Sequence, residues 1–279
     1  MAVIRCIAML MTTLLLSACS LINAVTVPAT KSAAATTAPS DPPRPTATPR
    51  PADTGWQTIS PGVEYRELKA TVGGRSDRLS LARIEPAQAR LRVLYDSDRP
   101  RRVSDWLATS QAVAAVNGNY FDPQNRALGL VIQDGRVVGG APYQGFGGTF
   151  AVAGDEVRVR WNVNEPYYGE PLTYALQNFP MLVLPGGAPN LEIDDNQRLA
   201  PRTAVGQDRA GRILFVVSPG PTFTLTDFGK WLAASDLDLN AALNLDGGMS
   251  SGLVLRQGEV NLGVDSWVAV PDVIVVQAR

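Results

Sequence analysis

Short apolar runs separated by turn residues dominate the chain from about residue 56 onward. Alternating runs over 78–84 and 91–95 predict two strands, and the continuous apolar run over 273–276 predicts a buried final strand. Four further pairs of runs flank compact turn sequences and predict β-hairpins: 128–132 with 136–138, 149–152 with 157–161, 203–206 with 213–217, and 252–255 with 260–262.

Helical patterns are fewer. Residues 104–111 carry Ser104 as a predicted N-cap and an apolar face through Trp106 and Leu107, and 226–235 repeat the pattern after Thr226. Strands therefore outnumber helices, and tight turns join successive strands. The pattern predicts an α+β fold: one domain of mostly antiparallel or mixed β-sheet with a few helices.

The first residues have the pattern of an export signal. Arg5 precedes an apolar segment over 6–18 that is too short to span a bilayer. Leu16-Ser17-Ala18-Cys19 resembles a bacterial lipobox, which predicts cleavage after residue 18 and a lipid anchor on Cys19. An ordinary secretory signal is the alternative. Both interpretations predict an extracytoplasmic protein, and the lipobox predicts a lipid-anchored protein of the bacterial cell envelope.

Composition divides the rest of the chain in two. Residues 19–55 are rich in Ala, Thr and Pro, which predicts an extended, disordered linker. Residues 56–279 are long enough for one substantial core. Of the chain's 25 basic and 26 acidic residues, four and two lie before residue 56, which leaves this domain with a net charge of −3. That balance argues against nucleic acid as a partner.

Three polar segments follow or open apolar strands and carry the candidate chemistry. They are 117–122, 201–206 and 244–251. Because each lies at a strand end, we expect them to meet at one edge of a sheet. No His/Cys metal set and no cofactor motif are present, and Asp194-Asp195 is interpreted as part of a solvated loop.

The stretch 248–252 matches G-x-S-x-G, the nucleophile elbow of serine hydrolases. That chemistry normally needs a histidine base, and the chain has no histidine. A lysine base would have to be Lys31, Lys69 or Lys230, and Lys31 lies in the linker. Serine hydrolysis is therefore disfavoured.

Taken together, the three segments resemble the phosphodiester glycosidase family. The resemblance rests on Asn117-Gly118-Asn119-Tyr120-Phe121-Asp122, Arg202-Thr203-Ala204-Val205-Gly206 and Leu243-Asn244-Leu245-Asp246-Gly247-Gly248-Met249-Ser250-Ser251, in the family's order. Residues 177–183 and 270–275 also fit. One departure is that Asn178 and Phe179 stand where the family commonly has glycine, which alters one wall of the expected pocket.

The resemblance implies hydrolysis of a sugar-1-phosphodiester, with a glycan or sugar-phosphodiester as substrate. Asp246 is the first candidate for nucleophile or base, Asp122 is the second carboxylate, and Arg202 suits bidentate binding of the phosphodiester. The remaining candidates would bind substrate through amides, hydroxyls or backbone N–H groups: Asn117, Asn119, Thr203, Asn244, Gly247, Gly248, Ser250 and Ser251.

Each candidate also has a structural interpretation. Asn117 and Asn244 could hydrogen-bond turns, Asp122 could form a turn before Pro123, and Arg202 could pair with Asp246. Thr203, Ser250 and Ser251 suit structural roles better than catalytic ones. Two other functions stay open: a glycan-binding lipoprotein without turnover, and a structural envelope protein.

Overall fold

The computed structural model describes residues 50–279, which form one compact unit. The predicted signal peptide, the Cys19 anchor and the linker up to residue 49 lie outside the described residues. Every strand pairing in the three sheets is antiparallel, and helices contribute little. The predicted antiparallel sheets and few helices are confirmed, and the described unit is mostly β.

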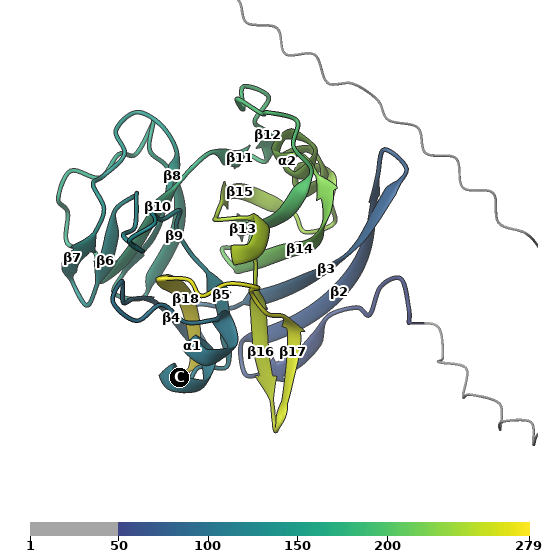
Figure 1. The fold of residues 1–279 in the computed structure, drawn as a ribbon, viewed down its shortest axis with the longest axis horizontal. Helices are drawn as coiled ribbons and strands as arrows, with labels where there is room; N and C mark the ends of the chain where they lie inside the picture. The colour runs from purple at the N-terminus through teal and green to yellow at the C-terminus, as the bar shows by residue number, and fades with distance from the viewer. Residues whose placement is uncertain (1–49) are drawn as a thin grey trace, which may run out of the picture. The chain divides into compact units, whose positions relative to one another are not determined.

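The largest sheet has eight strands and runs through the centre and right of Figure 1. In spatial order they are β1 (Gln57–Ser60), β2 (Val63–Val72), β3 (Arg75–Ile84), β14 (Ile213–Phe223), β13 (Ala200–Asp208), β15 (Leu239–Asn244), β11 (Met181–Leu184) and β12 (Ala188–Pro189).

Two five-stranded sheets complete the β-structure. The second sheet, on the left of Figure 1, has the order β7 (Arg136–Gly139), β6 (Val131–Gln133), β10 (Tyr174–Asn178), β8 (Gly148–Ala153) and β9 (Glu156–Trp161). The third has the order β17 (Val260–Val264), β16 (Leu253–Gln257), β5 (Ala114–Asn117), β18 (Asp272–Ala278) and β4 (Ala89–Tyr95).

The main core joins all three sheets, which fixes their relative positions. It contains Phe215 from the first sheet, Phe150 from the second and Ile274 from the third, each fully buried. Burying a side chain of this size contributes about 1.5–3 kcal/mol relative to leaving it in water. A functional site placed where these sheets meet therefore rests on the most heavily packed part of the protein.

The two helices cover the outer faces. Helix α2 (Leu225–Ala234) packs Phe228 and Leu232 against the eight-stranded sheet, and α1 (Val103–Ser110) packs Trp106 and Leu107 against the third sheet. No helix in the described residues is long and apolar enough to cross a membrane. A 3₁₀ turn, η1 (Gly248–Ser250), follows β15.

All four predicted hairpins are present, and the turn Asp134-Gly135 has positive φ at both residues, as the tightest hairpin turns require. Both predicted helix caps are wrong. Helix α1 begins at Val103, and the backbone N–H and hydroxyl of Ser104 donate to Asp265 instead. The cap of α2 is Thr224, whose hydroxyl accepts from the Asp227 N–H.

Candidate active site

The three predicted polar segments converge, although not at one edge of one sheet. Asn117 ends β5 in the third sheet, whereas Asn244 ends β15 in the first. The Asn117 Nδ2 donates to the Asp246 carbonyl at 2.8 Å, and the Leu245 N–H donates to the Thr203 carbonyl at 2.9 Å. The site is therefore built across a junction between sheets.

Asn117 holds this junction together. Its side chain is fully buried, and its Oδ1 accepts from the Thr203 hydroxyl and from the Gly252 N–H, both at 3.0 Å. With its Nδ2 bonded to the Asp246 carbonyl, one side chain links β5, β13 and the segment after β15. This geometry matches the structural alternative for Asn117 and Thr203, since neither side chain faces solvent.

Asn244 plays a similar part on the other side of the site. Its Nδ2 donates to the Tyr120 hydroxyl at 2.7 Å and to the Phe179 carbonyl at 3.1 Å, and the residue is buried. It therefore positions Tyr120, which is partly accessible. Burial raises the pKa of Tyr120 to about 12; the charge of Asp246 raises it further and that of Arg202 opposes the rise.

Asp246 is accessible and lacks a cationic partner. Its backbone N–H donates to the Gly118 carbonyl at 2.9 Å, and its Oδ1 accepts from the Gly247 N–H at 2.8 Å. Burial raises the pKa of Asp246 to about 6, partly offset by hydrogen bonds from Ser250 and Gly247. No Lys or Arg among residues 50–279 forms an ion pair with it. A carboxylate shifted toward neutral pH in this way is a candidate for proton transfer or nucleophilic attack.

Arg202 lies on the neighbouring chain segment. A Cβ added to Gly247 would lie 2.9 Å from the Pro201 carbonyl, so the strand of Arg202 and the turn after Asp246 are in contact. The guanidinium donates to the Phe223 carbonyl at 3.2 Å and the Arg198 carbonyl at 2.5 Å. Burial lowers the pKa of Arg202, but a guanidinium remains charged.

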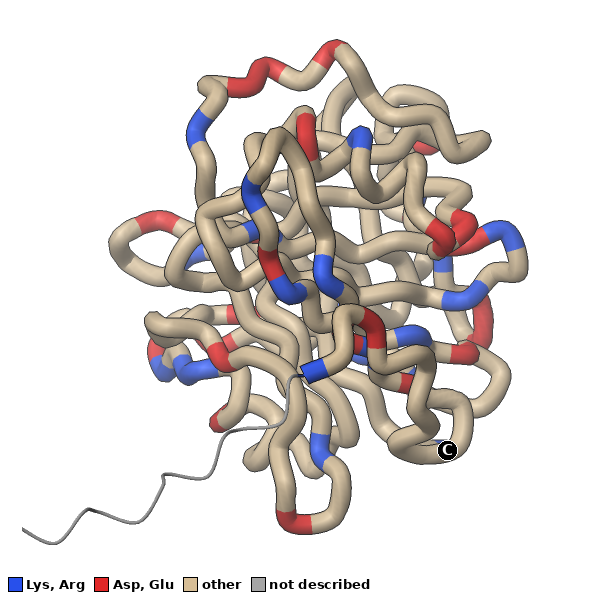
Figure 2. Tube along the Cα trace, turned by 90° about the vertical axis from the view of Figure 1, so that its right-hand side faces the viewer, with Lys and Arg blue, Asp and Glu red and all other residues tan. Residues whose placement is uncertain are grey.

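The alternative ion pair between Arg202 and Asp246 is not formed. In the described part of the chain Arg202 pairs with no carboxylate, because its two hydrogen bonds go to neutral carbonyls. Figure 2 shows Lys and Arg residues interleaved with Asp and Glu residues along the chain. The positive charge of Arg202 is therefore treated as a local feature and not as part of a larger basic patch. The charge of Asp195 also acts on Arg202, but no carboxylate of residues 50–279 lies within ion-pair distance of its guanidinium. A half-buried arginine without a direct ion pair is suited to bind an anionic ligand.

Asp122, the second predicted carboxylate, is engaged within its own loop. Its Oδ1 accepts from the N–H groups of Gln124 and Arg126, and its Oδ2 pairs with the Arg126 guanidinium at 2.7 Å. The backbone hydrogen bond from Arg126 lowers the pKa of Asp122 against a small opposing effect of burial. This geometry favours the turn-forming alternative, and a catalytic role for Asp122 stays a prediction.

Asp272 is a second carboxyl group next to the site, and it was not among the candidate residues predicted from the sequence. It is fully buried in β18 beneath the 117–119 turn, and its Oδ1 accepts from the Asn119 N–H at 2.6 Å. A Cβ on Gly118 would lie 1.8 Å from that oxygen, so only glycine fits there. Burial raises the pKa of Asp272 to about 8; the Asn119 hydrogen bond opposes this, and the charge of Asp246 adds to it. A lone aspartate within the apolar run 270–276 was the available signal.

Buried polar atoms without hydrogen-bond partners gather around this site. They include the Asp272 Oδ2, the Asn119 Oδ1, the Ser251 Oγ and both side-chain polar atoms of Asn178. Others in the described residues belong to Ser60, Glu67, Arg160 and Glu170, so these atoms alone do not single out the site. Each such atom is costly in a folded protein and is available to a ligand or water that reaches it. The predicted ligand contacts Asn119 and Ser251 are thus buried, whereas Gly247 and Gly248 are partly accessible and Ser250 is buried beside Asp246.

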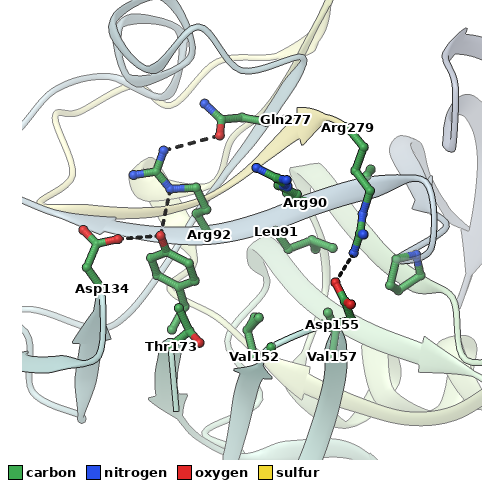
Figure 3. A pocket seen from close by; sticks show the side chains of 14 residues that line it. Arg90, Leu91, Arg92, Asp134, Val152, Asp155, Val157, Thr173, Gln277 and Arg279 are labelled. Atoms are coloured by element: carbon green, nitrogen blue, oxygen red, sulfur yellow. Dashed lines mark hydrogen bonds and ion pairs between the residues drawn. The ribbon is translucent and has the colours of Figure 1, made fainter. Parts of the chain in front are cut away.

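Among the surface cavities of the described residues, two bear on where the site lies. Figure 3 shows one of about 330 Å³ between β4 and the β8–β9 hairpin. Its charged groups bind one another: Arg92 donates to the Tyr174 hydroxyl, which donates to Asp134, and Arg279 pairs with Asp155. It contains no predicted site residue. The other, of about 640 Å³, borders Phe179 and Pro180 next to Asn244. No cluster of three or more metal-ligating side chains occurs in residues 50–279.

Comparisons with known proteins show the family and the fold. The family described as phosphodiester glycosidase matches residues 110–277, which include all three polar segments. The fold is similar to the catalytic domain of zebrafish N-acetylglucosamine-1-phosphodiester alpha-N-acetylglucosaminidase, auto-inhibited by its pro-peptide, with a TM-score of 0.63 and 20% identity over 80% of this chain and 86% of that one.

Two further solved structures share the fold. A hypothetical protein from Synechocystis gives a TM-score of 0.56 and 16% identity, covering 78% of this chain and 62% of that one. A putative exported protein from Burkholderia pseudomallei gives 0.51 and 14%, covering 72% and 74%. Comparison with curated protein sequences yields no match.

Proposed function

Because the chain belongs to the phosphodiester glycosidase family, we propose that it hydrolyses a sugar-1-phosphodiester and releases the free sugar and a phosphate monoester. The activity named for the zebrafish relative, removal of a sugar from a phosphodiester, supports this reaction class. The observation that carries the proposal is that Arg202 and Asp246, which form no ion pair with each other, both influence Tyr120. Both charges act on the Tyr120 hydroxyl, and neither is neutralised by the other.

The leaving group makes this chemistry feasible without histidine. Attack at the anomeric carbon breaks the carbon–oxygen bond to phosphorus-bound oxygen, which keeps the electron pair and leaves as a phosphate monoester. Its second pKa is about 6, so protonation of the departing oxygen is not essential. Arg202 stabilises the negative charge that develops on that group.

Asp246 acts on the attacking side in this proposal. As an ionised carboxylate it either attacks the anomeric carbon directly, to form a glycosyl intermediate that water hydrolyses, or removes a proton from the attacking water. The anomeric configuration of the released sugar distinguishes the two routes. Tyr120, fixed by Asn244 and neutral because its pKa is about 12, can donate a hydrogen bond to the substrate.

The supporting residues keep these groups in place. Asn117 links the strands that carry Arg202 and Asp246, and Asp272 holds the 117–119 turn from below. Rigid support of this kind matters because small displacements of catalytic groups strongly reduce rate.

A screen of purified sugar-1-phosphodiesters, measured as free sugar and phosphate monoester, tests the proposal. Stoichiometric release of both products, at more than one turnover per protein, is the expected result. Saturable binding of the same compounds with no product after long incubation would instead support the glycan-binding alternative.

We further propose that the substrate is an envelope or extracellular glycan and that Cys19 carries a lipid anchor. The lipobox-like sequence supports this location. Fractionation of wild-type and Cys19→Ser cells tests it: the wild-type protein should sediment with membranes and the variant should not. Equal membrane association of both proteins would refute the anchor.

A further inference from the structure

The 640 Å³ cavity beside the candidate active site is an apolar groove. Most of its lining side chains are apolar, including Phe146, Trp161, Phe179, Leu184, Leu191 and Ile193. Several are unusually exposed for their type: Leu191 is 68% exposed and Phe146 is 47% exposed. Its volume falls within the roughly 300–1,000 Å³ range of small-molecule sites.

This groove adjoins the candidate active site through Phe179. The Phe179 ring lines the groove and packs edge-on against Tyr120, with ring centroids 5.2 Å apart. Its carbonyl accepts from Asn244, whose amide also holds the Tyr120 hydroxyl. The Phe146 ring extends the same aromatic wall, 5.7 Å from Phe179. One residue therefore separates the groove from the groups assigned to the phosphodiester.

A loop forms a second connection. Residues 189–194 line the groove, and the same loop ends at Arg198, whose carbonyl accepts from the Arg202 guanidinium. The loop that lines the groove therefore also contacts the proposed phosphate-binding arginine, in addition to the contact through Phe179.

The charges of the groove select the kind of ligand that fits. No Lys or Arg lines it, and its charged groups are the exposed Glu192 and Asp194. A second phosphate would be repelled there, so the anionic part of a ligand belongs beside Arg202. Asn190 offers little to sugar hydroxyls, because its Nδ2 donates to the Met181 carbonyl and its Oδ1 accepts from the Glu192 N–H.

We propose that the groove binds the aliphatic chain of a lipid alcohol esterified to the sugar phosphate, so that the substrate is a lipid-linked sugar-1-phosphodiester. This inference rests on the proposed function and names its substrate class. Hydrolysis at the anomeric carbon then releases the free sugar and the lipid phosphate. Water supplies the anomeric hydroxyl group of the sugar, and its other proton passes to the phosphate monoester or to solvent.

Chain-length dependence tests the proposal directly. Dissociation constants of the full chain in detergent-free buffer are measured by calorimetry for ethyl, butyl, octyl and dodecyl phosphate. A fully buried methylene gains about fourfold in affinity, and an open groove should give roughly twofold per methylene until it is filled. Phe146→Ser and Leu191→Ser should each weaken octyl phosphate about tenfold and leave ethyl phosphate unchanged. Val260→Ser, an exposed apolar residue on β17 outside the groove, is the matched control and should change neither.

The outcomes separate this inference from the proposed function. Affinity that does not rise with chain length, or that is equally affected by Val260→Ser, overturns the lipid groove. The lipid groove is also overturned if Phe146→Ser and Leu191→Ser weaken the binding of a neutral oligosaccharide and leave the binding of octyl phosphate unchanged. Turnover of a methyl phosphodiester with no chain-length effect would leave the enzyme assignment intact and remove the groove. Chain-length-dependent binding without any turnover would support the groove and remove the enzyme assignment.

Discussion

Two segments that look alike in sequence have opposite environments in the structure. Residues 117–122 and 244–251 both start with an asparagine that ends a buried strand and both carry an aspartate. In the first, the asparagines are buried and Asp122 is neutralised by Arg126. In the second, Asp246 is partly accessible and forms no ion pair, and its charge and that of Arg202 both act on the Tyr120 hydroxyl. The proposed function assigns a supporting role to the first segment and the chemistry to the second.

This difference shows that the chemistry depends on which charges are left uncompensated. Asp122 accepts hydrogen bonds and an ion pair from within five residues of chain, an arrangement that stabilises a loop. Asp246 has one recorded backbone donor and a raised pKa, so it keeps basicity near neutral pH. Reactive carboxylates in enzymes are commonly tuned in this way by burial.

Replacing the reactive carboxylate should have the largest effect. Asp246→Asn keeps the acceptor for the Gly247 N–H but removes the negative charge, so release of sugar should fall by about 10³-fold. Initial rates on freshly purified protein measure this, because an Asn-Gly pair deamidates and would restore aspartate. Asp246→Ala serves as the control that cannot revert. Turnover within tenfold of wild type in both variants would contradict the assigned role.

Removing the unpaired positive charge should rank second. Arg202→Gln retains a donor for the Phe223 carbonyl but not the charge, and kcat/KM should fall about 100-fold. Inorganic phosphate should also inhibit the variant more weakly than the wild type. Arg126→Gln is the matched control in the other segment, since Arg126 is exposed and paired with Asp122, and it should retain activity. Equal losses in both variants would show that Arg202 has no special role.

Asp272 extends the comparison to the layer beneath the first segment. Its folded pKa of about 8 lies above its unfolded value of 3.8, so between these pH values the native state holds a proton that the unfolded state has lost. Stability should therefore fall as pH rises through this window, by at most about 1.4 kcal/mol per pH unit. Asp272→Asn cannot ionise and should lack this slope. Denaturant unfolding at pH 5 and pH 8 measures the difference, and parallel pH dependence in both proteins would show that Asp272 ionises freely.

The acid limb of activity should report Asp246 instead. Because its pKa is about 6, the carboxylate is mostly ionised at pH 7 and mostly protonated at pH 5. The value of kcat/KM should accordingly fall about tenfold between pH 7.5 and pH 5. An acid limb below pH 4 would assign the essential base to a carboxylate with a lowered pKa, and Asp122 would then be the first to examine.

Local pattern was enough to predict the hairpins and the buried strands, because turn residues and alternation act over a few positions. It misplaced the cap of α1, since Asp265 reaches that helix from 161 residues away. The sequence also predicted that the three segments converge, but it predicted one edge of one sheet, whereas they meet at a junction between two sheets. Asn117 bonds across 129 residues to the Asp246 carbonyl, and such pairing follows from how the sheets pack rather than from spacing.

The roles of the two aspartates could not be told apart in sequence for the same reason. Both precede small or turn-forming residues, and only the fold reveals that Arg126 returns to Asp122 whereas Arg202 does not reach Asp246. Asp272 was overlooked because its neighbours in sequence are apolar. Its chemical environment comes from Gly118 and Asn119, which lie on another strand end.

The smallest effect is expected at Asp122, and it provides the most direct comparison with Asp246. Asp122→Asn leaves an acceptor for the Gln124 and Arg126 N–H groups and removes only a partly exposed ion pair. Ion pairs exposed to solvent contribute little to stability, so the melting temperature should hardly change and kcat/KM should fall by no more than about twofold. Steady-state kinetics and thermal unfolding, run beside Asp246→Asn, measure both. A loss approaching that of Asp246→Asn would mean that the two segments share the chemistry and that the Arg126 pair opens when substrate binds.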